Sequence, residues 1–322
     1  MPNPGKIAPA RDNAAPGAPI TSRDNRWLKD FRLALRGGLP TESGCIGVEG
    51  LRLVEEALRS DLPVEALLVS ASGERHLEHL ASLLASSGRA GLRVLRTTDR
   101  LFSGLADTES PQGIAALVRP RIASFDDLLR PASGDAPLIA VLAGVQDPGN
   151  VGTILRTAEA FGATGAATCA SGVSGTANPF SPKVLRASAG ASLRLPILHG
   201  VGLPVLLAQL RVSGVKVFAA TAHDLPAQSG TFASSPASPS SSASFASPLL
   251  SPWQVVWLEP AAILIGNEGA GLPDDIARSA DACIRIPVAA GVESLNAAIA
   301  AALIFYEAAR QRLPDSIGRG RS

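Results

Sequence analysis

Three short segments in the second half of the chain combine polar side chains with glycines and could together form a site. The first spans residues 144–158 and carries Asn150 and Arg156, the second is Gly266–Gly269 with the sequence GNEG, and the third is 293–298 with the sequence ESLNAA. Arginine suits phosphate, amide side chains bind hydroxyl groups, and glycines let the backbone approach a ligand closely. The three segments therefore predict a ligand-binding site.

Each of these residues also has an ordinary structural interpretation. Asn150 could be only a helix-capping residue, and Ser294 or Asn296 could be only the cap of the last helix. Arg156 could be only a surface charge, and glycines after strands are common in turns. The occurrence of all three segments in one chain nevertheless favours a functional site.

The second and third segments follow apolar runs that are typical of buried strands. Residues 263–265 and 284–288 predict two short strands, each followed by a loop that contains glycine. From Asn296 onward the sequence predicts a strongly apolar helix. Two successive units of this kind would place both loops at the carboxyl ends of neighbouring strands, which is where open α/β sheets bind ligands.

Alternating strand and helix patterns predict an α/β fold for the remainder of the chain. The first half reads as a small α/β domain, with helices over 26–35, 51–59, 76–86 and 99–107 and strands over 45–48, 64–70, 92–95 and 113–118. The second half adds helices over 124–129, 151–161, 181–189 and 205–213, and strands over 138–142, 166–169, 195–197 and 215–221.

Composition marks the boundaries of the two domains. The first domain covers residues 25–120, and the second covers residues 137–314. The predicted segments outside these cores are a disordered tail at 1–24, a linker at 121–136, a disordered insertion of Ser, Pro and Ala at 227–252, and a tail at 315–322. The insertion lies within the second domain and is expected to loop out from its surface.

Charge and cysteine content limit the classes of function. The chain of 322 residues has 29 basic and 28 acidic side chains, so it lacks the overall positive charge of many nucleic-acid binders, although a local basic patch is compatible with this balance. Cys45, Cys169 and Cys283 are scattered, so we expect neither a metal site nor a disulfide framework. Neither a signal peptide nor a membrane-length apolar run is visible in the sequence, which predicts a soluble cytoplasmic protein with no membrane partner.

The three segments resemble the three motifs of the SpoU/TrmH family of RNA ribose 2′-O-methyltransferases, within the SPOUT class. The resemblance is carried by DPGNVGTILRTAEAFGA (147–163), LIGNEGAGL (264–272) and IPVAAGVESLNAAIAAALIFYEA (286–308), and it covers residues 137–312 apart from the insertion. The sequence VEGLRLVEEALRSDLPVEALLVS (48–70) also resembles the ribosomal-protein-like N-terminal substrate-binding domain that many members carry.

The resemblance implies an α/β trefoil knot, in which the last strand and helix thread through an earlier loop. Knots are so rare that periodicity alone would not suggest one. The resemblance also implies a homodimer that acts on RNA, with ribosomal RNA favoured over transfer RNA. S-adenosylmethionine would bind in a bent pose, held largely by backbone groups. The cofactor-binding residues that it implies are Leu264, Gly266, Asn267, Gly269, Gly271, Ile286, Val288, Ser294 and Leu295.

The same resemblance implies catalytic roles for five residues. Arg156, reached from the opposite protomer, would grip phosphate and stabilise the developing alkoxide, because a guanidinium hardly deprotonates. Asn150 would bind the target ribose or phosphate. Glu268 would orient Arg156 or Asn150 across the dimer. Ser294 and Asn296 would position the substrate and brace the knot.

Two further cations could contact RNA. Lys183 and Arg186 lie on a predicted helix and are candidate phosphate contacts, although both could equally be solvated surface charges. The N-terminal domain would select the RNA by its shape and unpaired bases. Its aromatic residues Trp27 and Phe31 are expected in the core rather than as stacking platforms for bases.

Two other classes of function remain open at this stage. One is an RNA-binding or ribosome-assembly protein of the same fold that has lost catalysis. Against it argue five intact polar residues, namely Asn150, Arg156, Glu268, Ser294 and Asn296. The other is a nucleotide-dependent enzyme with a doubly wound sheet. The glycines of residues 266–271 follow the order G-x-x-G-x-G rather than G-x-G-x-x-G, which argues against that class.

Overall fold

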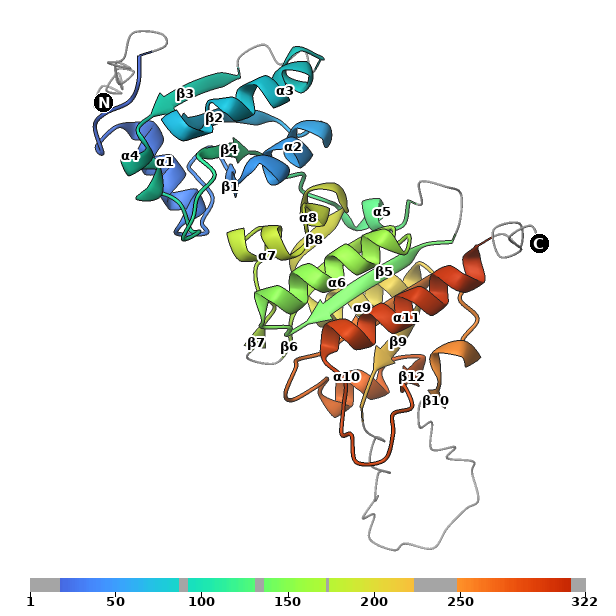
Figure 1. Cartoon of the computed structure of the whole chain (residues 1–322). Helices are drawn as coiled ribbons and strands as arrows, with labels where there is room; N and C mark the ends of the chain where they lie inside the picture. Colours follow the sequence, from blue (N-terminus) through green and yellow to red (C-terminus); the bar gives the residue numbers. More distant parts are fainter. Residues whose placement is uncertain (1–17, 87–91, 131–135, 172–173, 223–247, 314–322) are drawn as a thin grey trace, which may run out of the picture. The chain divides into compact units, whose positions relative to one another are not determined.

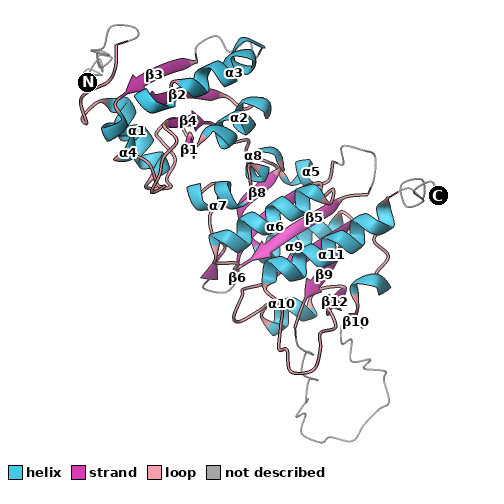
Figure 2. Cartoon of the chain, viewed as in Figure 1, coloured by secondary structure: helices cyan, strands magenta, loops and turns pink. Residues whose placement is uncertain are grey.

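The computed structural model describes residues 18–86, 92–130, 136–171, 174–222 and 248–313. Two compact units divide the chain between Arg119 and Pro120 (Figure 1). Each unit has its own sheet with helices packed against it, as the magenta strands and cyan helices of Figure 2 show.

The first unit is built on a sheet with the strand order β1-β4-β2-β3. Strand β4 runs antiparallel to both β1 and β2, whereas β3 runs parallel to β2. The elements of this unit are α1 (Arg26–Leu35), β1 (Ile46–Glu49), α2 (Leu51–Arg59), β2 (Val64–Ser70), η1 (Ala71–Gly73), α3 (Arg75–Ser86), β3 (Arg93–Thr97), α4 (Asp99–Ser103) and β4 (Ile114–Val118).

Helix α1 forms because its apolar side chains fall on one side and its first turn is capped. The side chain of Asn25 accepts a hydrogen bond from the Trp27 backbone N–H at 2.9 Å, which satisfies one of the free donors at the helix start. Leu28 and Phe31 are fully buried. They pack in a core cluster that includes Phe102 of α4. Phe31 is therefore a core residue, as the sequence predicted.

The predicted N-terminal tail over residues 1–24 is too long. Ile20 is only 5% exposed, and its backbone N–H donates to the Arg96 carbonyl at 2.7 Å beside the edge strand β3. Burial of this side chain and the strand-like bond attach the chain to the first unit from about this point. Residues 1–17, where the remainder of the predicted tail falls, lie outside the described part.

The second unit is built on a mostly parallel sheet with the strand order β10-β12-β9-β11-β5-β6-β7, with β8 also paired to β6. Only the β6–β7 pair is antiparallel among these described strands. The strands are β5 (Leu138–Ala143), β6 (Gly165–Ser171), β7 (Ser174–Gly175), β8 (Ile197–Gly202), β9 (Lys216–Ala220), β10 (Leu249–Leu250), β11 (Ala261–Ile265) and β12 (Ala282–Ile284).

Helices cover both faces of this sheet. They are α5 (Phe125–Leu128), α6 (Pro148–Ala160), α7 (Pro182–Ala187), α8 (Ala191–Arg194), α9 (Leu203–Val212), η2 (Pro252–Gln254), α10 (Asp274–Arg278) and α11 (Ala297–Arg312). Side chains of α6, α7 and α11 form one core cluster with the sheet, and side chains of α5, α9 and α10 form the other.

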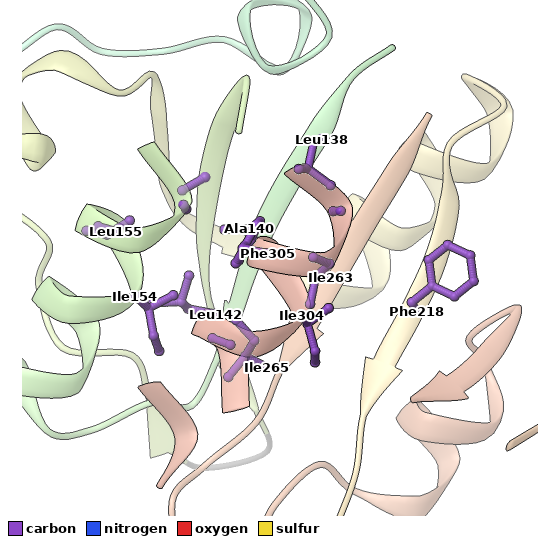
Figure 3. Packing of buried hydrophobic residues seen from close by; sticks show 14 of the residues in the cluster. Leu138, Ala140, Leu142, Ile154, Leu155, Phe218, Ile263, Ile265, Ile304 and Phe305 are labelled. Atoms are coloured by element: carbon purple, nitrogen blue, oxygen red, sulfur yellow. The ribbon is translucent and has the colours of Figure 1, made fainter. Parts of the chain in front are cut away.

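Strand β5 shows why the sequence produces this three-layer arrangement. All six of its residues are buried. Leu138 and Leu142 join the cluster with α6 and α11, whereas Ile139 and Val141 join the cluster with α9. Successive side chains of a strand point to opposite faces, so a continuous apolar run is what a strand covered on both sides requires. Figure 3 shows part of the first cluster, which includes Ala140 of β5 and Phe305 of α11.

The two loops of the predicted site do not follow neighbouring strands. Strand β9 lies between β11 and β12 and pairs in parallel with both. The prediction placed the second strand at 284–288, but β12 ends at Ile284. Ile286 and Val288 alternate with other residues as they would in a strand, yet they lie in a loop. Sheet order depends on long-range pairing, which the local pattern does not contain.

Two predicted irregular segments are shorter than expected. Leu128 of α5 is fully buried in the core of the second unit, so the helix at 125–128 belongs to that unit and not to a linker. Leu250 lies in β10 and Pro252 is buried at the start of η2, so the predicted insertion does not extend to 252. Residues 131–135, 223–247 and 314–322 lie outside the described part, and so do the linker, insertion and tail predicted there.

Candidate active site

A cavity of about 330 Å³ lies beyond the carboxyl ends of β9, β11 and β12. It is closed by the loop 266–272, by α10, and by the loop that leads into α11. Eight of the nine predicted cofactor-binding residues line it, namely Gly266, Asn267, Gly269, Gly271, Ile286, Val288, Ser294 and Leu295. The structure therefore brings the second and third predicted segments together around one space.

The ninth predicted residue, Leu264, does not line the cavity. Its side chain is fully buried in the core cluster that contains α9 and α10. The next residue along β11, Ile265, lines the cavity instead. The two neighbours differ because successive side chains of a strand point to opposite faces of the sheet, and a role for Leu264 in cofactor binding stays a prediction.

Part of the cavity wall was not predicted from the sequence. Ala220 at the end of β9 lines the cavity, as do Thr221 and Ala222, which follow it. Asp274 of α10 and Glu293 line it as well. The strand that ends near Thr221 was predicted, but its place between the other two strands was not. That placement would have identified the three residues as part of the wall.

The loop after β11 is held in a tight turn by Asn267. The Asn267 side-chain oxygen accepts from the backbone N–H groups of Gly269 and Ala270, both at 3.0 Å, and its Nδ2 donates to the Gly144 carbonyl at 2.9 Å. The backbones of Asn267 and Gly271 also exchange two hydrogen bonds of 3.0 Å. The loop is therefore fixed both internally and against the segment after β5.

Two glycines in this loop are required by its geometry. A Cβ atom on Gly266 would lie 2.6 Å from the carbonyl carbon of Gly271, a contact with backbone that cannot move aside. Gly271 itself has a φ of +67°, a conformation that costs most L-residues free energy. The pattern of glycines thus sets the shape of the loop that closes the cavity.

A polar network joins the three predicted segments beside the cavity. The Asn150 Nδ2 donates to Glu268 Oε1 at 3.1 Å, and the Asn296 Nδ2 donates to Asn150 Oδ1 at 3.0 Å. Glu268 also accepts from the backbone N–H groups of Gln146 at 3.1 Å and Asp147 at 3.0 Å. The Glu268–Asn150 contact lies within one chain, whereas the prediction placed it across a dimer.

The direction of each bond in this network follows from the charge of Glu268. An ionised carboxylate only accepts hydrogen bonds, so Asn150 must turn its NH₂ group toward Glu268 and its oxygen toward Asn296. Asn296 then has its own oxygen free to cap α11, and it accepts from the backbone N–H groups of Ala298 at 2.9 Å and Ile299 at 3.3 Å. The charge on Glu268 therefore fixes the orientation of the side-chain amides of both Asn150 and Asn296.

Glu268 is stabilised in its ionised form. Partial burial would raise the pKa of its carboxyl group, but the hydrogen bonds from the Asn150 side chain and from the backbone N–H groups of Asp147 and Gln146 outweigh this effect. The net result is a pKa below the ordinary value. The acceptor on which the network depends is thus charged at neutral pH.

The start of α6 places Asn150 at this network and leaves Arg156 exposed. Asp147 caps the helix by accepting from the Asn150 backbone N–H at 2.8 Å, and Pro148 occupies the first helical position, where its missing N–H has no cost. The helix begins three residues before the predicted start at Val151. Arg156 is exposed and is not among the residues that line the cavity of its own chain.

The two other predicted RNA contacts lie on α7, which packs closely against α6. A Cβ atom on Gly152 of α6 would lie 2.5 Å from the Ala187 Cβ, so the glycine permits this close approach. Lys183 is exposed and Arg186 is half-buried. Neither residue lines the cavity.

The described part of the chain contains neither a membrane-spanning helix nor a cluster of metal-binding side chains. No helix there is both long and apolar enough to cross a membrane. In the same residues, no group of three His, Cys, Asp or Glu side chains is arranged to hold a metal ion.

Comparison with known proteins adds to this geometry. Residues 137–306 match the SpoU rRNA Methylase family, and residues 41–116 match the MRM3-like substrate binding domain. An uncharacterized tRNA/rRNA methyltransferase of Synechocystis is 32% identical over 92% of this chain and 94% of its own length. The 23S rRNA (guanosine(2553)-2′-O)-methyltransferase RlmP of Bacillus subtilis is 28% identical over 89% of this chain and 97% of its own length.

A solved structure is similar over nearly the whole chain. It is the AdoMet-bound rRNA methyltransferase of Sinorhizobium meliloti, with a TM-score of 0.70, 29% sequence identity, and coverage of 92% of this chain and 99% of that one. The first family match spans more than half of the 322 residues and includes all three segments of the site. The chain belongs to the SpoU rRNA Methylase family.

Proposed function

We propose that this protein transfers a methyl group from S-adenosylmethionine (AdoMet) to a ribose 2′-hydroxyl of ribosomal RNA. The observation that carries the proposal concerns Glu268. This residue lines the cavity and also accepts a hydrogen bond from Asn150, so the polar network lies directly beside the cavity. A cofactor in the cavity and a ribose at the network would then be neighbours. Alignment of two reactants in this way contributes several kcal/mol to catalysis, on the order of a 10⁵-fold rate effect or more.

The cavity suits AdoMet in size and in the groups of its wall. A volume of about 330 Å³ lies in the range of small-molecule sites. The loop 266–272 has a backbone that a ligand can approach closely because Gly269 and Gly271 carry no side chain. Gly266, Asn267, Ser294 and Leu295 would hold the cofactor, which supplies an electrophilic methyl group on sulfur. AdoMet bound to the related Sinorhizobium enzyme supports this assignment.

The chain's own polar residues would bind and activate the ribose. Asn150 has its amide oriented by Glu268 and Asn296, so its second N–H and its remaining lone pair have fixed directions toward a ribose or phosphate. Arg156 would hold the adjacent phosphate and stabilise the charge that develops on the 2′-oxygen. A guanidinium stays protonated in proteins, so the 2′-hydroxyl proton goes to solvent or to a group other than Arg156.

The position of Arg156 favours a homodimer in which each arginine serves the partner's cavity. Arg156 does not line the cavity of its own chain. Helix α11 packs beside α6, as Figure 1 shows, and carries exposed apolar residues that are spaced by four and then three residues, namely Ile299, Leu303 and Tyr306. This spacing is that of a helix seam which packs against another helix. A second copy on this stripe would lie next to the helix that carries Arg156.

Ribosomal RNA is favoured as the substrate by two observations. The relative from Bacillus subtilis is a 23S rRNA 2′-O-methyltransferase, and residues 41–116 match a substrate-binding domain. Transfer RNA is the second candidate, because the Synechocystis relative carries both substrates in its name. A trefoil knot and a cytoplasmic location remain predictions from the sequence.

A methyl-transfer assay tests the proposal. Total ribosomal RNA and total transfer RNA, both from cells that lack this gene, would be incubated separately with labelled AdoMet and the full chain. We expect label in ribosomal RNA at one position that resists alkaline cleavage, since a methylated 2′-oxygen cannot attack the adjacent phosphate. Label in transfer RNA alone would overturn the substrate assignment. Absence of label from both pools and from ribosomal precursor particles would overturn the enzymatic proposal.

A further inference from the structure

The wall of the cavity carries negative charge that is not balanced by any cation among the described lining residues. Its charged members are Glu268, Asp274 and Glu293, and no described Lys, Arg or His lines the cavity. A wall of one sign attracts ligands of the opposite sign more strongly than neutral ones. The cavity should therefore distinguish ligands by their net charge.

The three carboxylates differ in how far hydrogen-bond donors or a cation already compensate their negative charge. Glu268 accepts hydrogen bonds from Asn150 and from two backbone N–H groups. Asp274 lies 3.3 Å from the Arg278 guanidinium, which cancels much of its charge. Glu293 is exposed, and the described residues place no hydrogen-bond donor or cation on its carboxylate. Glu293 is thus the wall carboxylate with the most charge available to a ligand.

We infer that Glu293 makes the cavity prefer the cationic methyl donor over the neutral product, and so promotes release of the product. This inference rests on the proposed function. AdoMet carries a sulfonium, an ammonium and a carboxylate, and its net charge is positive. S-adenosylhomocysteine (AdoHcy) has lost the sulfonium charge and is neutral overall.

The loss of charge accompanies the chemical step. The ribose 2′-oxygen forms a bond to the methyl carbon while the bond from that carbon to sulfur breaks, and its electron pair remains on sulfur. The 2′-hydroxyl proton leaves to solvent. The products are a neutral thioether, a methylated ribose and a proton, so the ligand left in the cavity has lost the net positive charge that Glu293 attracts.

Charge selectivity is tested by measuring the dissociation constants of three ligands by calorimetry. They are AdoMet, AdoHcy and sinefungin, in which a carbon bearing a protonated amine replaces the sulfonium. Each would be titrated into the full-length wild-type chain and into the Glu293→Gln variant. The matched control is Asp275→Asn, which removes an exposed carboxylate from α10 that does not line the cavity.

We expect the wild-type chain to bind AdoMet and sinefungin more tightly than AdoHcy. Glu293→Gln should reduce this preference by about threefold to tenfold, because one unit charge a few ångströms away has an effect of this size in a partly solvated site. Asp275→Asn should leave the preference within about twofold of wild type, and added salt should reduce it in the wild-type chain.

The other outcomes separate this inference from the proposed function. Equal affinity of all three ligands for the wild-type chain would overturn the inference while the cofactor assignment stands. An equal loss of affinity for all three ligands in Glu293→Gln, or the same change in Asp275→Asn, would also overturn it. Failure of the wild-type chain to bind any of the three would overturn the cofactor assignment itself. Thermal unfolding of each variant shows whether it is folded.

Discussion

Asn150 donates its side-chain N–H to Glu268 Oε1 at 3.1 Å, although 118 residues separate the two in the sequence. The contact connects the first turn of α6 to the loop that closes the cavity. Asn296 extends the connection to α11 through a bond of 3.0 Å to Asn150. The three segments thus share one set of polar contacts, and a substitution of any one of these side chains should affect the other two.

Coupling between Asn150 and Glu268 is the first prediction. Each of Asn150→Ala and Glu268→Ala should lower the free energy of unfolding by about 1 kcal/mol, and a double-mutant cycle should give a coupling of about 0.5–1.5 kcal/mol. Urea unfolding of the wild type, both single variants and the double variant measures this value. The control pairs Glu268→Ala with Arg211→Ala on α9, for which the two effects should add. Additive effects for Asn150 and Glu268 would mean that the contact contributes nothing.

The ionisation of Glu268 predicts a dependence of stability on pH. Its pKa in the folded chain is lowered from the ordinary value of 4.5, so its contribution is complete at pH values above about 4.5 and is lost as the pH falls through the lower folded value. The wild type should therefore exceed Glu268→Gln in stability by a constant amount near neutral pH, and the difference should shrink in acid. Unfolding curves for both proteins from about pH 7 to pH 3 measure this. A difference that grows as the pH falls would contradict the assignment.

The two glycines of the cavity loop should respond differently to the same substitution. Gly266→Ala brings a methyl group to 2.6 Å from backbone atoms of Gly271, so it should destabilise the chain by about 2 kcal/mol or more and abolish binding of AdoHcy. Gly269→Ala meets nothing closer than the Asn267 side-chain oxygen at 3.7 Å, so its stability should change little. Thermal unfolding of both variants checks the contrast. Equal stability of the two variants would show that the loop can open to accommodate the methyl group of Gly266→Ala at no cost in free energy.

Local features of the site were predictable from the sequence, and its three-dimensional assembly was not. The helix over 51–59 and the strand over 64–70 have the predicted bounds, because their apolar spacing is unambiguous. Asn296 caps α11 as its position before an apolar run indicates. The position of β9 between β11 and β12 depends on pairing between distant segments. Which side chains of β11 face the cavity depends on that position. For this reason the sequence identified neither Thr221 nor Ile265 as part of the cavity wall.

Arg156 should be required for methyl transfer and not for cofactor binding. Arg156→Ala should reduce kcat by about 100-fold or more through loss of charge stabilisation, while the dissociation constant for AdoHcy stays within about twofold of wild type. Single-turnover methyl transfer and calorimetry give the two values. Arg211→Ala, which changes an exposed arginine on the opposite helical layer, is the control and should retain full activity. Near-normal turnover of Arg156→Ala would refute its assigned role.

Mixed dimers test whether the arginine acts on the partner's cavity. Arg156→Ala and Gly266→Ala should each be inactive alone, because one lacks the cation and the other lacks the cavity. After mixing and exchange of subunits, one of the two cavities in a mixed dimer combines an intact loop with an intact partner arginine. Activity should then reappear, up to about a quarter of the wild-type value for random exchange between equal amounts. No recovery in a sample shown to contain mixed dimers would place Arg156 at the cavity of its own chain.

The apolar stripe on α11 should hold the dimer together. Leu303 and Tyr306 are 43% and 54% exposed in the single chain, and Leu303→Glu or Tyr306→Glu would introduce a charge that cannot be buried against a second copy. Either variant should sediment as a monomer at concentrations where the wild type is a dimer. Val212→Glu on α9 is the control, since Val212 is 90% exposed on the other helical layer. A variant that remains dimeric would locate the interface elsewhere.

The long sequence separations within the polar network determine when the site can exist during protein synthesis. Asn150 must meet Glu268, 118 residues later, and Asn296, 146 residues later. A nascent chain that has just completed the first unit and α6 holds Asn150 but neither of its partners, so it has no cavity and cannot bind the methyl donor. Contacts between such distant segments also form slowly. Competence to methylate thus arises only once the last helix has been synthesised and has packed against the sheet.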